Sequence, residues 1–304
     1  MQHFITNDDL SLEITTAVIQ RAHAMAQSPA DFQNLARHQQ LATLFFEPST
    51  RTRLSFTSAM HSLGGTVLGF ESSSSTSTAK GESLIDTIRV VSQYVDIIAL
   101  RHPQAGAAQL AAKYASVPVI NAGDGAHLHP TQTLADLTTI DHYKHRLNHL
   151  TIAFAGDLKY GRTVHSLVQA LMRYGQNRFI FVSHPTLKIP VTLRAQLVAK
   201  NIAFEEVTNF AAINVPLDAL YMTRVQAERF ATPAAYDEVK DAIQLTPAQR
   251  NLLTPETLLL HPLPRGHELP TTFDTWPQAH YFDQVKAGRF VRMALIETLL
   301  AQNH

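Results

Sequence analysis

The sequence has 304 residues, a length that predicts two domains of about 150 residues each. Its 25 basic and 25 acidic side chains give a formal net charge of zero, which argues against a broad surface for nucleic acid or for an anionic membrane. No cysteine is present, which excludes disulfides, thiolate metal sites and thiol nucleophiles. Because the net charge is zero, any recognition of an anion must be local.

The N-terminal stretch MQHFITNDDL does not combine a basic region with a following apolar region. The chain also has no run of about 18 apolar residues, the length needed to span a bilayer as a helix. We therefore expect a soluble cytoplasmic protein that binds neither membrane nor nucleic acid.

Helices and strands are predicted to alternate through the first half of the chain. Apolar residues at helical spacing predict helices at 10–26, 50–63, 83–95, 105–115 and 133–145. Short apolar runs predict strands at 41–46, 66–70, 96–101 and 117–123. This alternation is typical of a parallel sheet flanked by helices.

The second half follows the same pattern after a polar segment at about 141–148, which is the expected domain junction. Strands are predicted at 149–157, 178–183, 202–207 and 219–223, and helices at 163–175 and 192–201. A strongly amphipathic last helix is predicted at 289–302. The predicted fold is therefore α/β, with two domains that each contain a parallel sheet.

The segment FEPSTRTR follows the first predicted strand and contains the start of a helix, for which Ser49 is the expected N-cap. The N–H groups and the positive dipole end of such a helix favour a phosphate. Arg51 and the hydroxyls of Thr50 and Thr52 would add directed hydrogen bonds. Taken alone, the same segment also fits a well-capped surface helix with solvated arginines.

Other polar segments follow predicted strands in the same way: LRHP, GDGAHLHPTQTLADL and LLLHPLPRG. Ligands of open parallel sheets bind beyond the carboxyl ends of the strands, so Arg101, His129 and Gln132 could converge on the anion held by Arg51. The run HLH at 127–129 could suggest a metal, but no further ligand stands at suitable spacing. No metal is expected.

In the second half, GDLKYGRT lies at another strand-to-helix turn. It lacks the G-x-G-x-x-G pattern, so a dinucleotide site is disfavoured, and Arg162 is better interpreted as a carboxylate ligand. Arg224 and Gln226 follow a buried run and would also face a ligand, although an arginine can simply mark the end of a strand.

The serine-rich tract ESSSSTSTAKGES, with Lys80 near its end, could be a flexible linker. Because it lies within a strand-helix repeat, it also fits a lid that closes over an anion.

Together these motifs resemble the catalytic chains of the aspartate carbamoyltransferase family. FEPSTRTR, KGESLIDT, RHP, HPTQTLADL, GDLKYGRT, MTRVQ and HPLPRG occur in the family's order over nearly the whole chain. The related ornithine carbamoyltransferases have His-Cys-Leu-Pro where this chain has His261-Pro262-Leu263-Pro264, and they lack the lysine lid.

The resemblance implies transfer of a carbamoyl group from carbamoyl phosphate to the α-amine of L-aspartate, an early step of de novo pyrimidine biosynthesis, without a cofactor. It implies a carbamoyl phosphate-binding domain at 1–145, to which a C-terminal helix at about 286–304 returns, and an aspartate-binding domain at 146–285. It also implies a homotrimer with shared active sites. Whether a regulatory chain binds is left open, as is regulation by nucleotides.

The resemblance also implies a role for each motif residue. The expected phosphate ligands are Ser49, Thr50, Arg51, Thr52 and Arg101. Thr52, Arg101 and His129 would polarise the carbamoyl oxygen, and Gln132 with the backbone carbonyls of Leu263 and Pro264 would hold the carbamoyl amide. Arg162 would bind the α-carboxylate of aspartate, and Arg224 with Gln226 its side-chain carboxylate. Glu47 would pair with Arg162 and Arg229 when the domains close.

Lys80 would reach the site of a neighbouring subunit, together with a lid hydroxyl that is either Ser75 or Thr76. Two alternatives remain beside the main interpretation. One is a carbamoyltransferase for another amine such as ornithine, for which Arg224 and Lys80 would be poorly suited. The other is an inactive phosphate-binding homologue.

Overall fold

The structure is a computed structural model that describes residues 2–72, 80–125 and 128–302. It divides into two compact units: unit 1 contains Met1–Thr138 and Lys286–His304, and unit 2 contains Thr139–Val285. Both points of division lie inside helices, in α5 (Pro130–Lys144) and in α9 (Tyr281–Leu300).

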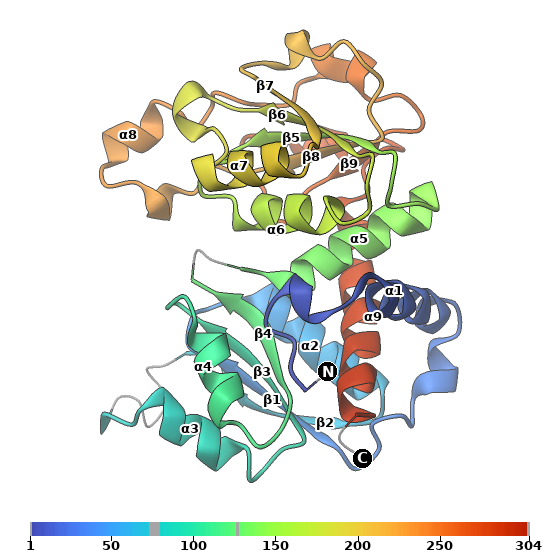
Figure 1. The fold of residues 1–304 in the computed structure, drawn as a ribbon, viewed down its shortest axis with the longest axis vertical. Coiled ribbons are helices and arrows are strands. Elements are labelled where there is room, and N and C mark those ends of the chain that lie inside the picture. The colour runs from blue at the N-terminus through green and yellow to red at the C-terminus, as the bar shows by residue number, and fades with distance from the viewer. Residues whose placement is uncertain (1, 73–79, 126–127, 303–304) are drawn as a thin grey trace. The chain divides into compact units, whose positions relative to one another are not determined.

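Among the described residues, unit 1 contains a parallel sheet of four strands in the order β2-β1-β3-β4 (Figure 1). The strands are β1 (Gln40–Phe45), β2 (Thr66–Phe70), β3 (Ile97–His102) and β4 (Val119–Asp124). The helices between them are α2 (Thr50–Ser62), α3 (Leu84–Val91) and α4 (Ala107–Tyr114), and α1 (Leu12–Gln27) precedes β1.

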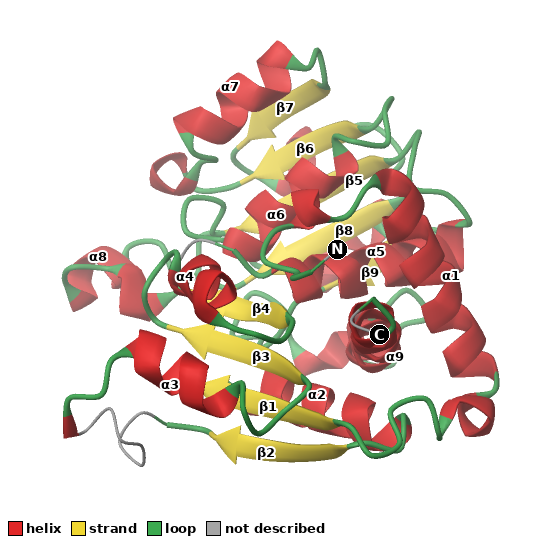
Figure 2. Ribbon diagram, turned by 60° about the horizontal axis from the view of Figure 1, so that its bottom comes forward, coloured by secondary structure: helices red, strands yellow, loops and turns green. Residues whose placement is uncertain are grey.

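Helices cover both faces of this sheet because successive strand residues point to opposite sides. Leu41 and Phe45 of β1 belong to a core with side chains of α1, α2, α5 and α9, whereas Ala42 and Leu44 pack with side chains of α3 and α4. Figure 2 shows α3 and α4 on one side of the sheet and α2 and α9 on the other. Burial of each large apolar side chain contributes about 1.5–3 kcal/mol.

Unit 2 contains, in its described part, a parallel sheet of five strands in the order β7-β6-β5-β8-β9. The strands are β5 (Thr151–Gly156), β6 (Arg178–Val182), β7 (Ala203–Val207), β8 (Ala219–Thr223) and β9 (Leu258–Leu260). Its complete helices are α6 (Arg162–Leu171), α7 (Val191–Ala199) and the short α8 (Pro233–Asp237). An aromatic cluster of Phe154, Phe179, Phe181 and Tyr221 fills one face of the sheet.

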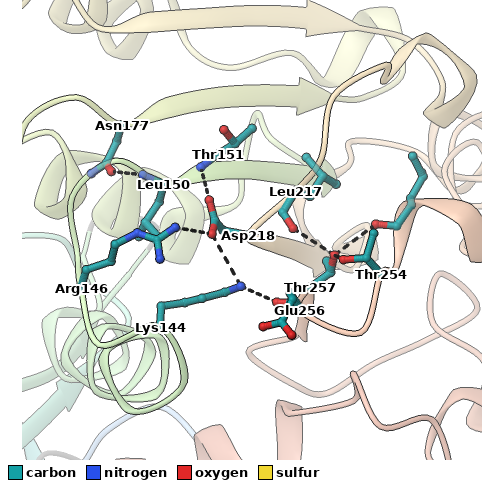
Figure 3. Close-up of polar contacts among 11 residues, drawn as sticks. Lys144, Arg146, Leu150, Thr151, Asn177, Leu217, Asp218, Thr254, Glu256 and Thr257 are labelled. Atoms are coloured by element: carbon teal, nitrogen blue, oxygen red, sulfur yellow. Dashed lines mark hydrogen bonds and ion pairs between the residues drawn. The ribbon is translucent and has the colours of Figure 1, made fainter.

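A polar network lies at the amino ends of β5 and β8 (Figure 3). The Asp218 carboxylate accepts hydrogen bonds from the backbone N–H of Thr151 (2.8 Å) and from Arg146 Nη2 (2.7 Å). Lys144 Nζ lies 3.6 Å from Asp218 Oδ1 and donates to the Glu256 carbonyl. The network joins the end of α5 to the sheet at the edge opposite to the strands' carboxyl ends.

The predicted α/β architecture is confirmed: both sheets are parallel and flanked by helices, and the C-terminal helix packs in unit 1. The predicted amphipathic character of this helix is wrong. All residues of Phe290–Ile296 are buried, because α9 is covered by α1, α2 and α5. α8 was not predicted. No helix in the described ranges has the length and apolar character needed to cross a membrane.

Candidate active site

The predicted phosphate motif lies where β1 leads into α2 at the carboxyl edge of the unit 1 sheet. Ser49 is the N-cap residue of α2, as predicted, but its hydroxyl donates to Thr52 Oγ1 (3.0 Å) instead of capping a backbone N–H. The N–H groups of a first helical turn have no acceptor within the helix. The start of α2 therefore presents backbone donors beside the exposed Arg51 and the buried Thr52.

Arg101 lies at the carboxyl end of β3, beside β1, and is 7% exposed. Its Nη2 donates to Glu47 Oε1 (2.7 Å), and its Nη1 donates to the Ala122 carbonyl (3.4 Å). Since a buried guanidinium needs an anionic partner, Glu47 holds this cation in place within unit 1. The predicted pairing of Glu47 with Arg162 and Arg229 stays a prediction for a closed state.

His129 and Gln132 lie at the start of α5, after β4. His129 is buried, and its carbonyl accepts from the backbone N–H of Gln132 (3.0 Å). At the end of β4, the Asp124 carboxylate accepts hydrogen bonds from the N–H groups of Gly106 (3.0 Å) and Leu128 (3.1 Å). The carboxyl ends of β1, β3 and β4 thus bring Arg51, Arg101 and His129 to one edge of the same sheet.

Lys80 is exposed and lies shortly before α3. The two candidate lid hydroxyls, Ser75 and Thr76, lie outside the described residues. Their role stays a prediction.

In unit 2, the segment after β5 packs against the segment after β8. Arg162 is the first residue of α6, and Gln226 Nε2 donates to the Tyr160 carbonyl (3.1 Å). Gly156 allows this close approach, because a Cβ atom there would lie 1.9 Å from the Thr223 carbonyl oxygen. Burial raises the pKa of Asp157, whose carboxylate accepts from the N–H of Tyr160 (2.9 Å) and fixes the turn.

Arg224 forms a bidentate ion pair with Glu228, in which Nη1 lies 3.1 Å from Oε2. The hydrogen bond from the Arg224 guanidinium lowers the pKa of the Glu228 carboxyl, so Glu228 is ionised at neutral pH. Arg101 and Arg224 are both predicted to bind a substrate. In this structure each of them contacts a carboxylate of its own chain instead.

The turn after β9 presents the backbone of Leu263 and Pro264, which are joined by a cis peptide bond. His261 organises this turn: its Nδ1 accepts from the N–H of Leu263 (2.8 Å), and its Nε2 bonds to Glu268 Oε1 (2.9 Å). Glu268 Oε1 also accepts from the N–H of Gly266 (2.7 Å). Because Nδ1 is an acceptor, the imidazole is neutral with its proton on Nε2.

Within the part of the chain that the structure describes, no three histidine or acidic side chains group as metal ligands. The strand ends carry guanidinium, hydroxyl and backbone N–H donors. Such donors fit phosphate and carboxylate groups.

Sequence comparison assigns both halves of the chain to one family. Residues 2–142 match the domain described as "Aspartate/ornithine carbamoyltransferase, carbamoyl-P binding domain", and residues 148–299 match the "Asp/Orn binding domain" of the same family. The chain belongs to the aspartate/ornithine carbamoyltransferase family.

Members of this carbamoyltransferase family with high identity match the chain along its whole length. The aspartate carbamoyltransferase catalytic subunit of Finegoldia magna is 52% identical over 299 residues, which cover 98% of each chain. That of Lachnoclostridium phytofermentans is 51% identical over 301 residues, which cover 99% of this chain and 98% of the relative.

Solved carbamoyltransferase structures have the same fold. The catalytic subunit of M. jannaschii aspartate transcarbamoylase superposes with a TM-score of 0.92 at 45% identity, covering 100% of this chain and 99% of the other. Aspartate transcarbamoylase from Trypanosoma cruzi, in complex with carbamoyl phosphate and aspartate, gives a TM-score of 0.91 at 36% identity, with 98% and 96% covered.

Sequence reasoning missed the side chains that hold the site residues in place. These are Asp136 beside Gln132, Glu228 beside Arg224, and the His261–Glu268 pair below Leu263. Only Asp136 carried a signal, since it stands four residues after Gln132 on the same helix, α5.

Proposed function

We propose that the chain catalyses transfer of the carbamoyl group from carbamoyl phosphate to the α-amine of L-aspartate, giving N-carbamoyl-L-aspartate and phosphate. The observation that carries this proposal is the identity of 52% and 51%, over nearly all of both chains, with aspartate carbamoyltransferase catalytic subunits. The donor groups at the strand ends of both units support it, because both substrates are anions.

In unit 1, the phosphate group would bind at the start of α2. Ser49, Thr50 and Thr52 would offer hydroxyl and N–H donors, and Arg51 would add a charged fork. The dipole of an exposed helix contributes only about 0.3–1 kcal/mol, so the directed side-chain bonds would supply most of the binding energy. Arg101 would leave Glu47 to bind the phosphate and the carbamoyl oxygen.

The carbamoyl group would be held by donors on one side and acceptors on the other. Thr52, Arg101 and His129 would donate to the carbonyl oxygen, which becomes an oxyanion as the amine attacks. Gln132 and the carbonyls of Leu263 and Pro264 would accept from the NH2 group. His129 acts here as a hydrogen-bond donor and not as the general base.

Aspartate would bind through the arginines of unit 2. Arg162 would hold the α-carboxylate at the start of α6, and Arg224 with Gln226 would hold the side-chain carboxylate. Their bond partners support these roles: Gln226 is fixed by Tyr160, and the Arg224 fork is already aligned for a carboxylate by Glu228.

Electrostatics and orientation would account for most of the catalysis, since carbamoyl phosphate is already activated. Two anions repel each other, and Arg51, Lys80, Arg101, Arg162 and Arg224 would offset that repulsion. The neutral amine forms a new C–N bond, and the C–O bond to phosphate then breaks. The leaving phosphate can accept the amine proton, so no side chain is required as the base.

We further propose that the enzyme acts in the cytoplasm as a homotrimer in which Lys80 serves a neighbouring subunit's site. The exposure of Lys80 before α3 is consistent with such a reach. A regulatory chain would be an additional partner of such a homotrimer.

The test is an assay of carbamoyl aspartate formation by the purified chain, with ornithine supplied in parallel. We expect product with aspartate and none with ornithine, because Arg224 would repel a cationic side chain. Product with ornithine alone would identify an ornithine-type enzyme. Phosphate binding without either product would identify an inactive homologue, and both outcomes would contradict the proposal.

A further inference from the structure

Gln132 is held by a carboxylate one helical turn further along α5. Its Nε2 donates to Asp136 Oδ1 at 2.7 Å, and the Asp136 side chain is fully buried. Gln132 itself is half-buried at the start of the helix. The bond therefore joins a residue of the candidate site to a charged group in the core of unit 1.

The chemistry of this bond decides which way the Gln132 amide faces. An ionised carboxylate has only acceptor atoms, so it binds the NH2 end of an amide and repels the carbonyl end. With the NH2 end turned toward Asp136, the Gln132 carbonyl oxygen is directed away from that carboxylate. The orientation of the amide thus follows from the charge of Asp136 and not from the distance alone.

Arg292 of α9 provides the compensating positive charge. It is 4% exposed and donates to Gly288 O (2.8 Å), Thr131 Oγ1 (3.3 Å) and Ser55 Oγ (3.1 Å). Burial lowers the pKa of Arg292 to about 10, and the negative charge of Asp136 opposes that shift. Arg292 therefore stays protonated at neutral pH and favours the ionised form of Asp136.

We propose that Asp136, with Arg292 as its counter-charge, is a positioning residue that presents the Gln132 carbonyl to the NH2 of the carbamoyl group. This proposal rests on the proposed function and adds a basis for substrate selection. A carbamoyl group offers two N–H donors, whereas an acetyl group offers a methyl in the same place. Gln132, oriented as an acceptor, would favour carbamoyl phosphate over acetyl phosphate.

The decisive variant is Asp136→Asn, which is nearly isosteric. Asparagine has both a donor and an acceptor, so it can bind Gln132 in either orientation. In this variant the Gln132 carbonyl oxygen is no longer held in one orientation, while the side chain at position 136 keeps its volume. A matched control is Thr138→Val, which removes another buried polar group of α5, where Thr138 Oγ1 donates to the Leu134 carbonyl (2.7 Å).

The measured quantity is the ratio of the inhibition constant of acetyl phosphate to the KM of carbamoyl phosphate. The inhibition constant of inorganic phosphate is measured as well, because phosphate binding does not involve Gln132. In Asp136→Asn we expect this ratio to fall about tenfold, while the inhibition constant of phosphate changes by no more than about twofold. Thr138→Val should keep the wild-type ratio. Gln132→Ala should lower the ratio, and adding Asp136→Asn to it should have no further effect.

Should Asp136→Asn fail to fold, Gly288→Ala tests the same network. A Cβ atom at position 288 would lie 2.6 Å from Arg292 Nη1, so the guanidinium must move while its charge is retained. The ratio should fall again, by less than in Asp136→Asn.

An unchanged ratio in an active Asp136→Asn enzyme would overturn the role of Asp136 and leave the proposed function intact. The same holds if all three ligands weaken in parallel, since a general distortion of α5 would produce that result. If the wild-type chain forms no carbamoyl aspartate, the proposed function fails first, and the inference fails with it.

Discussion

Arg101 Nη2 lies 2.7 Å from Glu47 Oε1, and the arginine side chain is only 8% exposed. An arginine proposed to bind phosphate is therefore occupied by a carboxylate of the same unit. Any phosphate that binds Arg101 must compete with Glu47. This competition makes the affinity for anions sensitive to a residue that does not bind them.

We expect Glu47→Gln to bind inorganic phosphate about threefold to tenfold more tightly, because a neutral amide competes less well for the guanidinium than a carboxylate does. Turnover should fall if Glu47 also pairs with Arg162 and Arg229 during closure. Phosphate inhibition and kcat are the two measurements. Glu228→Gln is the matched control, since its partner Arg224 is assigned to aspartate and phosphate inhibition should stay unchanged. Weaker phosphate binding in Glu47→Gln would contradict the competition.

Substitution of the proposed oxyanion donors should affect turnover more than binding. Removal of one such donor typically costs about 2.7–4 kcal/mol in the transition state. His129→Ala and Thr52→Ala should therefore lower kcat by about a hundredfold or more, with a much smaller change in phosphate inhibition. Equal losses in kcat and in phosphate affinity would assign both residues to ground-state binding instead.

The shared site can be tested by subunit mixing. Arg51→Ala and Lys80→Ala chains should each be inactive alone. If Lys80 serves a neighbouring subunit, dissociation and reassembly of a mixture should restore activity, because some sites then receive both an intact Arg51 and an intact Lys80. Native mass spectrometry checks that mixed oligomers formed. Mixed oligomers without activity would place Arg51 and Lys80 in the same chain's site.

Acid should destabilise unit 2 through His261. Burial lowers the pKa of His261, so below about pH 6.5 the unfolded chain binds a proton that the folded chain excludes. The free energy of unfolding should thus fall as the pH is lowered from 7.5 through 6.5. Glu268 acts in the same direction at lower pH, because its pKa is also lowered in the folded chain and its contribution is lost on protonation.

Urea unfolding at several pH values measures this effect. His261→Gln cannot be protonated, and we expect its stability to depend less on pH than that of the wild type over the same range. His165 gives a remaining slope, since burial also lowers the pKa of His165. Identical slopes in the variant and the wild type would show that His261 does not contribute.

Strand-helix alternation was predictable because each strand is a short apolar run and each functional motif directly follows one. This is why the sequence pattern alone places FEPSTRTR, RHP and GDLKYGRT at strand ends. The contacts that hold those motifs could not be predicted. Arg292 meets Thr131 across 161 positions of sequence and Arg101 meets Glu47 across 54, so no local pattern links them.

The region before β9 also carried little signal. α8 contains only Pro233–Asp237, too short to display helical periodicity, and the 3-10 helix Pro247–Leu252 follows no apolar repeat. For α9 the sequence carried a clear pattern, but the exposed face that this pattern predicted was wrong. Its amphipathic pattern suggested an exposed face, but the charged Arg292 side chain is buried, hydrogen-bonded and balanced by the negative charge of Asp136.

The Asp218 network at the amino ends of β5 and β8 assigns different tasks to the two edges of the unit 2 sheet (Figure 3). One edge carries the arginines that would hold substrate, and the other carries ion pairs that only fasten the chain to itself. Substitutions at Asp218 and its neighbours could therefore change the thermal stability of the enzyme during evolution. Substrate specificity would evolve independently, through substitutions at the opposite ends of the same strands.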